Sequence, residues 1–339
     1  MHEDDPNSTP ERLLYLMSEI PRAAAVSEVG EHVLIGELQR RIGEAPGVIV
    51  GIGDDAAVVG LSEPTVAVST DVLVQDRHFR LNWSSANDIG HRVAGANLAD
   101  IAAMGAMPTS LVVGLVLPPT TQVGWVLDFL DGLAQECESI GAAVVGGDLA
   151  AGDTIMISAT ALGDLQGREP VRRNGAQPAD VVAIAGRLGW AGAGLSLLSR
   201  GFTSPRVLVE AHRVPKPPYL AGIHAASAGA HAMLDVSDGL LTDLGHIAAA
   251  SGVSIDIEAA AVPIDDPVRD AASAFNADAL AWVLAGGDDH AIAATFAPDT
   301  QLPPGFTVIG RVHEPDGDGP TVTVDSVARP DLRGFDHFR

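Results

Sequence analysis

Short apolar segments of strand length alternate with longer amphipathic segments of helix length along the whole chain. This alternation constrains the fold most, because strands interleaved with helices bury their apolar faces by packing in layers. It predicts an α/β protein built from layers of sheet and helix. The 339 residues are enough for two hydrophobic cores, so two domains are expected.

Each element is predicted from its pattern of apolar residues. In the first half we expect strands over 48–50, 65–69, 111–117 and 154–162, the first of them buried. Helical spacing predicts helices over 11–43, 84–105 and 123–140, the last capped by Gly141. In the second half we expect strands over 181–185, 232–234 and 291–296 and helices over 194–199 and 237–250. A segment rich in Gly, Arg and Pro over 163–180 predicts the crossing between two domains, 1–168 and 169–339.

The charge balance is strongly acidic. With 44 Asp and Glu against 20 Lys and Arg the net charge is −24, and such a surface repels phosphate backbones and anionic lipid. We therefore expect neither nucleic acid nor a membrane as a partner. The longest apolar stretches, such as 111–117, are far shorter than the roughly 18 residues of a membrane span. The acidic start Met1–Asp5 lacks the pattern of a secretory signal, which predicts a cytoplasmic protein.

Single residues narrow the chemistry further. Cys137 is the one cysteine and has neither a CxxC pattern nor a neighbouring histidine, so we expect it to fill space in a helix. Lys216 is the one lysine, which excludes a GxxxxGK phosphate loop and the strand lysine of a protein kinase. If the protein handles phosphates, arginine or metal must neutralise them. Arg173 could bind a nucleotide phosphate with both arms of its guanidinium, although a solvated linker arginine fits the spacing equally.

The run Gly51–Ala56 has the glycine spacing of a dinucleotide-binding loop, and Asp71 lies at the distance of the ribose-binding acid. We reject this reading, because Asp54 and Asp55 would face a pyrophosphate where backbone N–H groups are needed. The segment before the next strand is also too short for a crossover helix. A nicotinamide cofactor is therefore not expected.

Six aspartates form the candidate site, most of them at the end of an apolar strand or the start of a helix: Asp55, Asp71, Asp100, Asp148, Asp235 and Asp238. Taken singly, each is explained as a turn or cap residue. Taken together they are not, because Asp100 shares an apolar helix stripe with Val93 and Asn97, and carboxylates beside buried strands are costly to desolvate without a cation. Hard oxygen ligands in this number predict Mg²⁺ held beside phosphates.

The sharpest motif is the segment 235–239. Asp235 ends a predicted strand, Ser237 is expected to cap the next helix, and the helix N-terminus offers N–H groups to a phosphate. A plain strand-to-helix turn explains the same residues, so both readings stay open. Asp243 and His246, further along the helix, are expected on its solvated side.

At five places the residues resemble one known family, the thiamine-monophosphate kinases. The matching segments follow the family's order along the full chain: Gly51–Ala56, Ser69–Asp71, Asn97–Ala106, Gly146–Asp148 and Asp235–Leu240. Single motifs are shared with the wider superfamily of aminoimidazole ribonucleotide synthetase and selenophosphate synthetase. The segment from Asp71 to Phe79 and the tail Gly334–Phe338 narrow the resemblance to the kinases.

The resemblance implies the two-domain fold of aminoimidazole ribonucleotide synthetase, in which each domain is a mixed sheet packed with helices. It implies transfer of the γ-phosphoryl group of ATP to thiamine monophosphate, giving thiamine diphosphate and ADP, with several Mg²⁺ ions. The N-terminal domain would bind metal and ATP and would pair with a second copy through its sheet, forming a homodimer. The C-terminal domain would complete the nucleotide and substrate site.

By position, the resemblance implies three groups of site residues. The magnesium ligands would be Asp55, Ser69, Thr70, Asp71, Asp100, Asp148, Asp235 and Asp238, of which Asp71, Asp148 and Asp235 would be the catalytic ones. ATP would contact Gly147, Asp148, Arg173 and Ser237. The thiamine phosphate would contact His78, Asp288 and Phe335, although by spacing alone His78 is a packed histidine and Phe335 a tail anchor.

The chain departs from the family in its substrate residues. Where the family usually has Gly-Gly-Glu-Asp-Tyr-Glu, the segment Gly286–Ala291 places Asp288 for the glutamate and His290 for the tyrosine. The tail aromatic is Phe335 rather than tyrosine or tryptophan. Asp288 is shorter than glutamate, so its reach to a cationic ring changes, whereas Phe335 can still stack on that ring.

The implied reaction needs no general base. A phosphomonoester has its second pKa at about 6, so its attacking oxygen is already ionised at neutral pH. Three other functions use the same residues: a sibling ATP-dependent synthetase, a metal-dependent phosphohydrolase, and a non-catalytic acidic protein that binds Mg²⁺. The selenium enzyme would need a reactive cysteine near its start, and Cys137 lies elsewhere.

Overall fold

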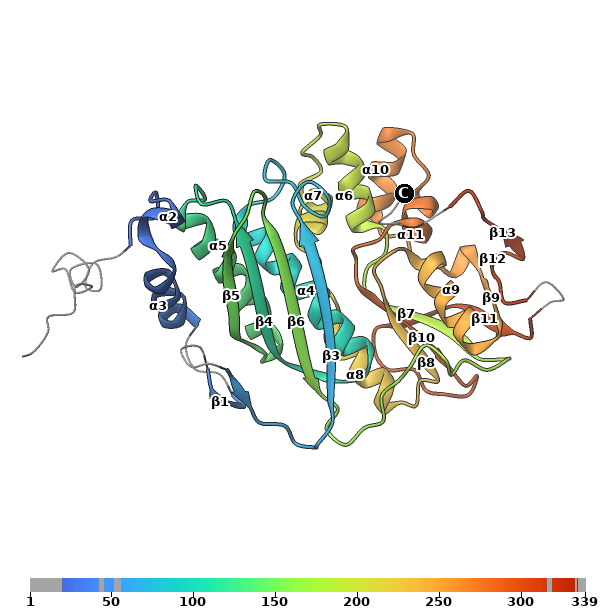
Figure 1. Cartoon of the computed structure of the whole chain (residues 1–339). Coiled ribbons are helices and arrows are strands. Elements are labelled where there is room, and N and C mark those ends of the chain that lie inside the picture. Colours follow the sequence, from blue (N-terminus) through green and yellow to red (C-terminus); the bar gives the residue numbers. More distant parts are fainter. Residues whose placement is uncertain (1–19, 43–45, 52–55, 316–318, 333, 335–339) are drawn as a thin grey trace, which may run out of the picture.

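The computed structural model describes residues 20–42, 46–51, 56–315, 319–332 and 334. They form two halves side by side, each with its own sheet and its own helices (Figure 1). None of the described helices combines the length and the apolar character needed to cross a membrane. The predicted α/β class with mixed sheets is confirmed, since each of the two larger sheets contains one parallel pair of strands among antiparallel ones.

The first half is built on a four-stranded sheet in the order β3-β6-β4-β5. Its strands are β3 (Val66–Val74), β4 (Met107–Leu117), β5 (Ala143–Ala151) and β6 (Met156–Asp164). Exposed residues alternate with partly buried ones along most of β3, because successive side chains leave a strand on opposite faces. One face of this sheet is covered by helices and the other is open, which is the arrangement that produces such alternation.

Two long helices, α4 (Ala86–Ala103) and α5 (Val123–Ile140), cover the inner face of this sheet (Figure 1). Ser85 begins α4 with a reciprocal cap: its hydroxyl accepts from the Asp88 N–H at 3.2 Å, and the Asp88 carboxylate accepts from the Ser85 N–H at 2.9 Å. Gly141 ends α5 in the left-handed conformation, as predicted. Helix α4 is buried around most of its circumference, because it packs against both halves.

The second half is built on a seven-stranded sheet in the order β13-β12-β9-β11-β7-β10-β8. Its strands are β7 (Val181–Ala185), β8 (Ala232–Val236), β9 (Ser254–Ile257), β10 (Ala291–Phe296), β11 (Phe306–His313), β12 (Val322–Val324) and β13 (Val327–Ala328). Strands β7, β8 and β10 are buried at every residue. Continuous burial of this kind requires helices on both faces of the sheet.

The helices of the second half supply those two layers. They are α6 (Trp190–Ser199), α7 (Arg206–Arg213), α8 (Tyr219–Ser227), α9 (Leu240–Ser251), the short η1 (Ala259–Ala261), α10 (Asp266–Phe275) and α11 (Ala279–Ala285). Helices α6, α7, α9, α10 and α11 share one core with the outer face of the sheet. Helix α8 and the end of α4 pack on the opposite face, which therefore looks toward the first half.

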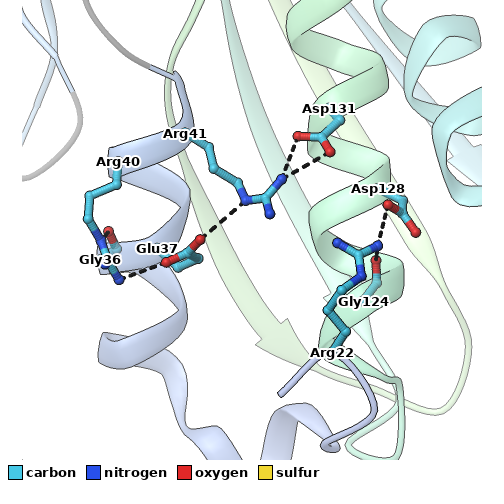
Figure 2. A network of polar contacts seen from close by, with 8 residues as sticks. All are labelled: Arg22, Gly36, Glu37, Arg40, Arg41, Gly124, Asp128 and Asp131. Carbon is cyan, nitrogen blue, oxygen red and sulfur yellow. Dashed lines mark hydrogen bonds and ion pairs between the residues drawn. The ribbon is translucent and has the colours of Figure 1, made fainter. Parts of the chain in front are cut away.

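The N-terminal segment is attached to α5 by surface ion pairs (Figure 2). It holds α2 (Val26–Val29), α3 (Glu31–Ile42) and a small sheet of β1 (Val48–Val50) and β2 (Val58–Val59). Arg41 donates from Nη1 to both carboxylate oxygens of Asp131 at 2.9 and 3.0 Å, and Arg22 pairs with Asp128. Exposed pairs of this kind contribute about 0–1 kcal/mol each. The prediction that 48–50 is buried is wrong, since Ile49 is 70% exposed.

Two of the candidate aspartates lie within strands rather than at strand ends. Strand β3 continues to Val74, so Asp71 lies within a strand and pairs with Ala159. Strand β5 runs through Asp148, which pairs with Gly114. Pairing with neighbouring strands overrides the low strand propensity of aspartate and glycine at these positions. The predicted boundary near residue 168 falls between β6 and β7 and stays a prediction.

Candidate active site

A cleft of 1690 Å³ lies between the two halves. Its walls come from β3 and α4 on one side, and from β8, the turn after it and the loop 286–290 on the other. Ten of the residues singled out in the sequence line it: Ser69, Thr70, Asp71, His78, Asp100, Arg173, Asp235, Ser237, Asp238 and Asp288. Candidate residues from distant parts of the chain therefore share one cleft.

Strand β3 presents its candidates by strict alternation. Ser69 and Asp71 are partly buried and lie on the inner face, between the exposed residues Val68 and Val72. Thr70 lies between them on the opposite face, where its hydroxyl donates to the Ala159 carbonyl at 2.9 Å and lies 3.0 Å from Thr160 Oγ1. A strand thus delivers Ser69 and Asp71 to the cleft by their side chains, whereas the Thr70 side chain is committed to β6.

Asp100 on α4 joins these two residues. The Ser69 hydroxyl donates to Asp100 Oδ2 at 2.6 Å. The pKa of Asp100 is raised to about 7, first by burial and then by the negative charges of Asp235 and Asp71. Asp71 on β3 and Asp235 on β8 are therefore close enough to Asp100 to disfavour its ionisation.

Asp235 faces the first half because of the alternation along β8. Met233, two residues before it, lies in the core shared with α4 and α8, and Leu234 and Val236 lie in the opposite core. Asp235 is 5% exposed, and its Oδ2 lies 2.9 Å from Nδ1 of His290, which is equally buried. Burial acts to lower the pKa of His290, but the hydrogen bond and charge of Asp235 outweigh it and raise that pKa.

The turn after β8 is organised by Asp243 rather than by Ser237. Helix α9 begins at Leu240 after Gly239, and no side chain of the N-cap residue closes it. Asp243 Oδ2 instead accepts from the N–H groups of Asp238 and Gly239, both at 3.0 Å. The expectation that Asp243 is solvated is wrong, because it is 3% exposed, and this burial raises its pKa to about 7. A carboxylate of the same chain therefore occupies these two N–H groups at the start of α9.

His246 is exposed, as predicted, and extends this acidic corner. Ligand atoms of Asp238, Asp243 and His246 all lie within 4.8 Å of one another. Asp243 and His246 are three residues apart on one face of α9, and Asp238 belongs to the turn before that helix.

The loop 286–290 aims three neighbouring side chains in three directions. Asp288 and His290 adopt φ values of 64° and 53°, in the left-handed region that costs most residues roughly 1 kcal/mol or more. The loop lies against the turn after β8, because the Asp288 N–H donates to the Ser237 carbonyl at 2.8 Å. Gly287 permits this approach, since a Cβ there would collide with that same carbonyl.

Asp289 and Asp288 have separate partners in this loop. Asp289 accepts from the N–H groups of Trp190 and Ala191 at 3.0 and 2.9 Å, which closes the N-terminus of α6. Asp288 Oδ2 accepts from Nη2 of Arg92 on α4 at 2.5 Å. Burial acts to raise the pKa of Asp288, but the Arg92 charge holds it below its ordinary value.

Four candidates remain: His78, Arg173, the predicted metal ligand Asp55 and the predicted substrate residue Phe335. Nδ1 of His78 accepts from the Val74 N–H at 2.9 Å at the edge of the cleft. Arg173 is exposed and lines the same cleft from the crossing segment. Asp55 and Phe335 lie outside the described residues.

Asp148 leaves the first sheet on its open face. It pairs with Gly114, which pairs with Ser158, which pairs with Val72, so this row of residues points away from Asp71. Gly147 and Asp148 are exposed and do not line the cleft of their own chain. The structure therefore separates this pair from the other candidates within one chain.

Four residues of the site were not predicted from the sequence: Arg92, Asp243, Asp289 and His290 in these roles. Asp243 had a usable signal, because an acid in the first turn of a helix often accepts from the N–H groups before it. An arginine within the apolar helix 84–105 is a second such signal, since a buried guanidinium needs an acceptor. The loop contacts of Asp289 and His290 depend on backbone conformation that residue types alone do not specify.

Comparison with known proteins places the chain in a family. It matches the models "AIR synthase related protein, N-terminal domain" over residues 53–165 and "AIR synthase related protein, C-terminal domain" over residues 177–323. It is 45% identical over 315 residues to the thiamine-monophosphate kinase of Mycobacterium tuberculosis, covering 92% of this chain and 93% of that protein.

Solved structures agree. The thiamine-monophosphate kinase of Stenotrophomonas maltophilia superposes with a TM-score of 0.76 at 33% identity, over 87% of this chain and 96% of that one. AaThiL complexed with AMPPCP and TMP gives a TM-score of 0.75 at 29% identity, over 93% of this chain and 99% of that one. The predicted resemblance is confirmed over nearly the whole length, and the chain belongs to the thiamine-monophosphate kinase family of AIR synthase related proteins.

Proposed function

We propose that this protein transfers the γ-phosphoryl group of ATP to thiamine monophosphate, giving thiamine diphosphate and ADP. The relative that is 45% identical carries the name of this activity. A structural neighbour binds AMPPCP and TMP, an analogue of ATP and the proposed acceptor. The reaction belongs to the cytoplasm, where ATP is supplied.

The observation that carries the proposal is the meeting of carboxylates from both halves in one cleft. Asp71 and Asp100 come from the first half and Asp235 from the second, and all three line the cleft, where the charges of Asp235 and Asp71 add to the burial that raises the pKa of Asp100. Two anionic substrates would be repelled by such a group unless cations were bound there. A cleft of this charge suits phosphoryl transfer only together with divalent metal.

The donor set fits Mg²⁺. Carboxylate and hydroxyl oxygens are the ligands that Mg²⁺ prefers, and one or two carboxylates with phosphate oxygens normally hold it. We propose Ser69, Asp71, Asp100, Asp235 and Asp238 as the described side chains that hold several Mg²⁺ ions, with Asp71 and Asp235 as the catalytic ones. Thr70 would contribute through its carbonyl, since its hydroxyl is bonded to β6. Bound Mg²⁺ would neutralise charge on the phosphates during transfer.

The chain's own residues hold and orient the substrates. Arg173 and Ser237 border the cleft where ATP would lie, and His78 and Asp288 border the part where the acceptor would lie. No general base is required, because the acceptor phosphate has its second pKa at about 6 and is ionised at neutral pH. The oxygen of that phosphate attacks the γ-phosphorus as the bond to the β-phosphate oxygen breaks, and ADP leaves.

The active form would be a homodimer joined through the open face of the first sheet. This face exposes Val66, Val68, Val72 and Met156, and Val68 is 59% exposed. Apolar side chains in such a row mark an interaction surface. A second copy on this face would also cover Gly147 and Asp148, so we propose that their contact with ATP, and the metal role of Asp148, require the dimer.

An acceptor-dependence assay tests the proposal. The protein is incubated with ATP and Mg²⁺, with and without thiamine monophosphate, and ADP, free phosphate and thiamine diphosphate are followed. We expect ADP and thiamine diphosphate in equal amounts and only with the acceptor. Free phosphate without acceptor would instead identify a phosphohydrolase, and no consumption of ATP would identify a non-catalytic metal-binding protein.

A further inference from the structure

We propose that Arg92 is the positioning residue of the acceptor site: it joins the two halves and holds Asp288 where the cationic ring of the acceptor binds. This inference rests on the proposed function and deepens it, since it assigns a specificity role to a residue outside the predicted site. It follows from the burial of Arg92, from its two partners and from the shape of the loop that carries Asp288.

Arg92 is a buried cation in a strongly acidic chain. It lies on α4 in the first half, is 6% exposed and lines the cleft. Its Nη1 donates to the His212 carbonyl and its Nη2 to Asp288 Oδ2, both at 2.5 Å. A guanidinium is costly to bury unless its N–H groups meet acceptors, so these two bonds determine where it can lie.

The two acceptors belong to different elements of the second half. His212 is in the last turn of α7, where carbonyls lack partners within the helix, so a cation there also suits the helix dipole. Asp288 belongs to the loop after α11. One side chain from α4 therefore fixes the end of α7 and the loop 286–290 against the first half.

Asp288 is held in a conformation that it would not adopt unaided. Its φ of 64° lies in the left-handed region, and residues keep such values where surrounding contacts over-determine them. Arg92 supplies a contact from the side chain, and the bond from the Asp288 N–H to the Ser237 carbonyl supplies one from the backbone. The carboxylate stays 43% exposed, so it remains available to a ligand in the cleft.

The surroundings of this pair suit a cationic heteroaromatic ring. Trp83 and Trp282 line the same cleft, and Trp83 meets His212 edge to face with ring centres 6.2 Å apart. His212 is neutral, because burial lowers its pKa to about 3. Nδ1 of His212 is buried and has no hydrogen-bond partner among the described residues. Asp288 thus offers a carboxylate to the ring, and Arg92 limits how far that carboxylate moves.

Kinetic constants for each substrate separate this role from general stabilisation. We expect Arg92→Gln to raise KM for thiamine monophosphate about tenfold or more, because the carboxylate loses its charged partner. KM for ATP should change by less than about twofold, since phosphate contacts lie elsewhere in the cleft. Arg92→Lys should be intermediate, because an ammonium keeps the charge but not the fork that reaches two acceptors.

A double-mutant cycle tests whether the two residues act as a unit. If Arg92 works through Asp288, Arg92→Gln combined with Asp288→Asn binds thiamine monophosphate no more weakly than Asp288→Asn alone. Calorimetric titration with thiamine monophosphate in the absence of ATP measures this without turnover. A wild-type protein that makes no thiamine diphosphate would refute the proposed function, whereas the calorimetric cycle would still decide on the pair.

Two matched variants serve as controls. Arg206→Gln removes the exposed pair with Glu210 on α7 and should leave both KM values unchanged. Tyr219→Phe removes another bond between the halves, from the Tyr219 hydroxyl to Glu136 at 2.6 Å, and should lower Tm without raising the acceptor KM. The proposal is overturned if Arg92→Gln leaves the acceptor KM unchanged, raises both KM values equally, or is matched by Tyr219→Phe.

Discussion

The two walls of the cleft place their acidic residues by different means. In the first half, Ser69, Asp71 and Asp100 lie on the regular faces of β3 and α4, where the period of the element aims each side chain. In the second half, Asp238 and Asp288 lie in turns, and Asp235 is the last polar residue of a buried strand. Regular secondary structure thus orients the acidic side chains of the first wall, whereas individual hydrogen bonds orient those of the second.

The second wall needs dedicated partners for this reason. His290 accompanies Asp235, Arg92 accompanies Asp288, and Asp243 holds the backbone of Asp238. On the first wall, a serine hydroxyl from the neighbouring strand accompanies Asp100. We conclude that substitutions beside the ligands should matter more on the second wall than on the first, which gives a ranked set of tests.

The largest effect is expected from the carboxylates themselves, and it should be the same on both walls. Asp71→Asn and Asp235→Asn each remove a charge at the phosphates and should lower kcat about 10²–10³-fold or more, as loss of one electrostatic contact does in other enzymes. Steady-state kinetics with saturating Mg²⁺ measures it, and the exposed Asp299→Asn is the control. If one of the two variants kept wild-type turnover, only one wall would take part.

Asp243 should have the next largest effect, on stability. Asp243→Ala leaves the N–H groups of Asp238 and Gly239 without their acceptor, and loss of such a helix-capping carboxylate costs about 1–2 kcal/mol. Urea denaturation of the metal-free protein measures this change in the free energy of unfolding. An unchanged midpoint would show that the turn is held without Asp243.

A pair of variants then compares the partners on the two walls. We expect His290→Gln to raise the Mg²⁺ concentration for half-maximal activity about tenfold, because buried Asp235 loses a charge-assisted hydrogen bond. Ser69→Ala should raise it about threefold at most, since a neutral hydrogen bond is weaker. Titration of activity with Mg²⁺ gives both values, and the reverse order would contradict the distinction between the walls.

The smallest effect is a pH-dependent one. Asp100 and Asp243 have folded pKa values of about 7 against an ordinary 3.8, so their ionisation costs stability. Their stabilising contribution in metal-free protein is full below the ordinary value and is lost as pH rises toward 7. Mg²⁺ binds the ionised form of Asp100, so the gain in Tm on adding Mg²⁺ should be larger at about pH 8 than at about pH 5.5. Equal gains would mean that Asp100 does not bind the ion.

The sequence predicted the placement of the acidic residues better for the first wall than for the second. Away from the walls, both halves contain elements whose bounds were predicted to the residue: α5 in the first half, and β7 and β10 in the second. Their apolar periodicity reports burial directly. Asp100 was placed on the inner stripe of its helix for the same reason. Strand β3 was predicted to end too early and β5 was not predicted as a strand, because pairing partners far along the chain extend these strands through Asp71 and Asp148.

The second wall shows what residue types cannot specify. Asp243 was expected in solvent because its place in the first turn of α9 suggests a contact with the preceding N–H groups but not that this contact is buried. The left-handed conformation of Asp288 and His290 is set by contacts with Arg92, Ser237 and Asp235, which are remote in sequence. Such placements arise only after the two halves have packed together.

The most direct test of the central claim is the position of the metal. Crystals grown with Mn²⁺ in place of Mg²⁺ and with a non-hydrolysable ATP analogue would show the ions by anomalous scattering. We predict ions at ordinary coordination distances from carboxylates of both halves, with Asp71 or Asp100 on one side and Asp235 or Asp238 on the other. Ions held by one half alone, or none in the cleft, would contradict the account.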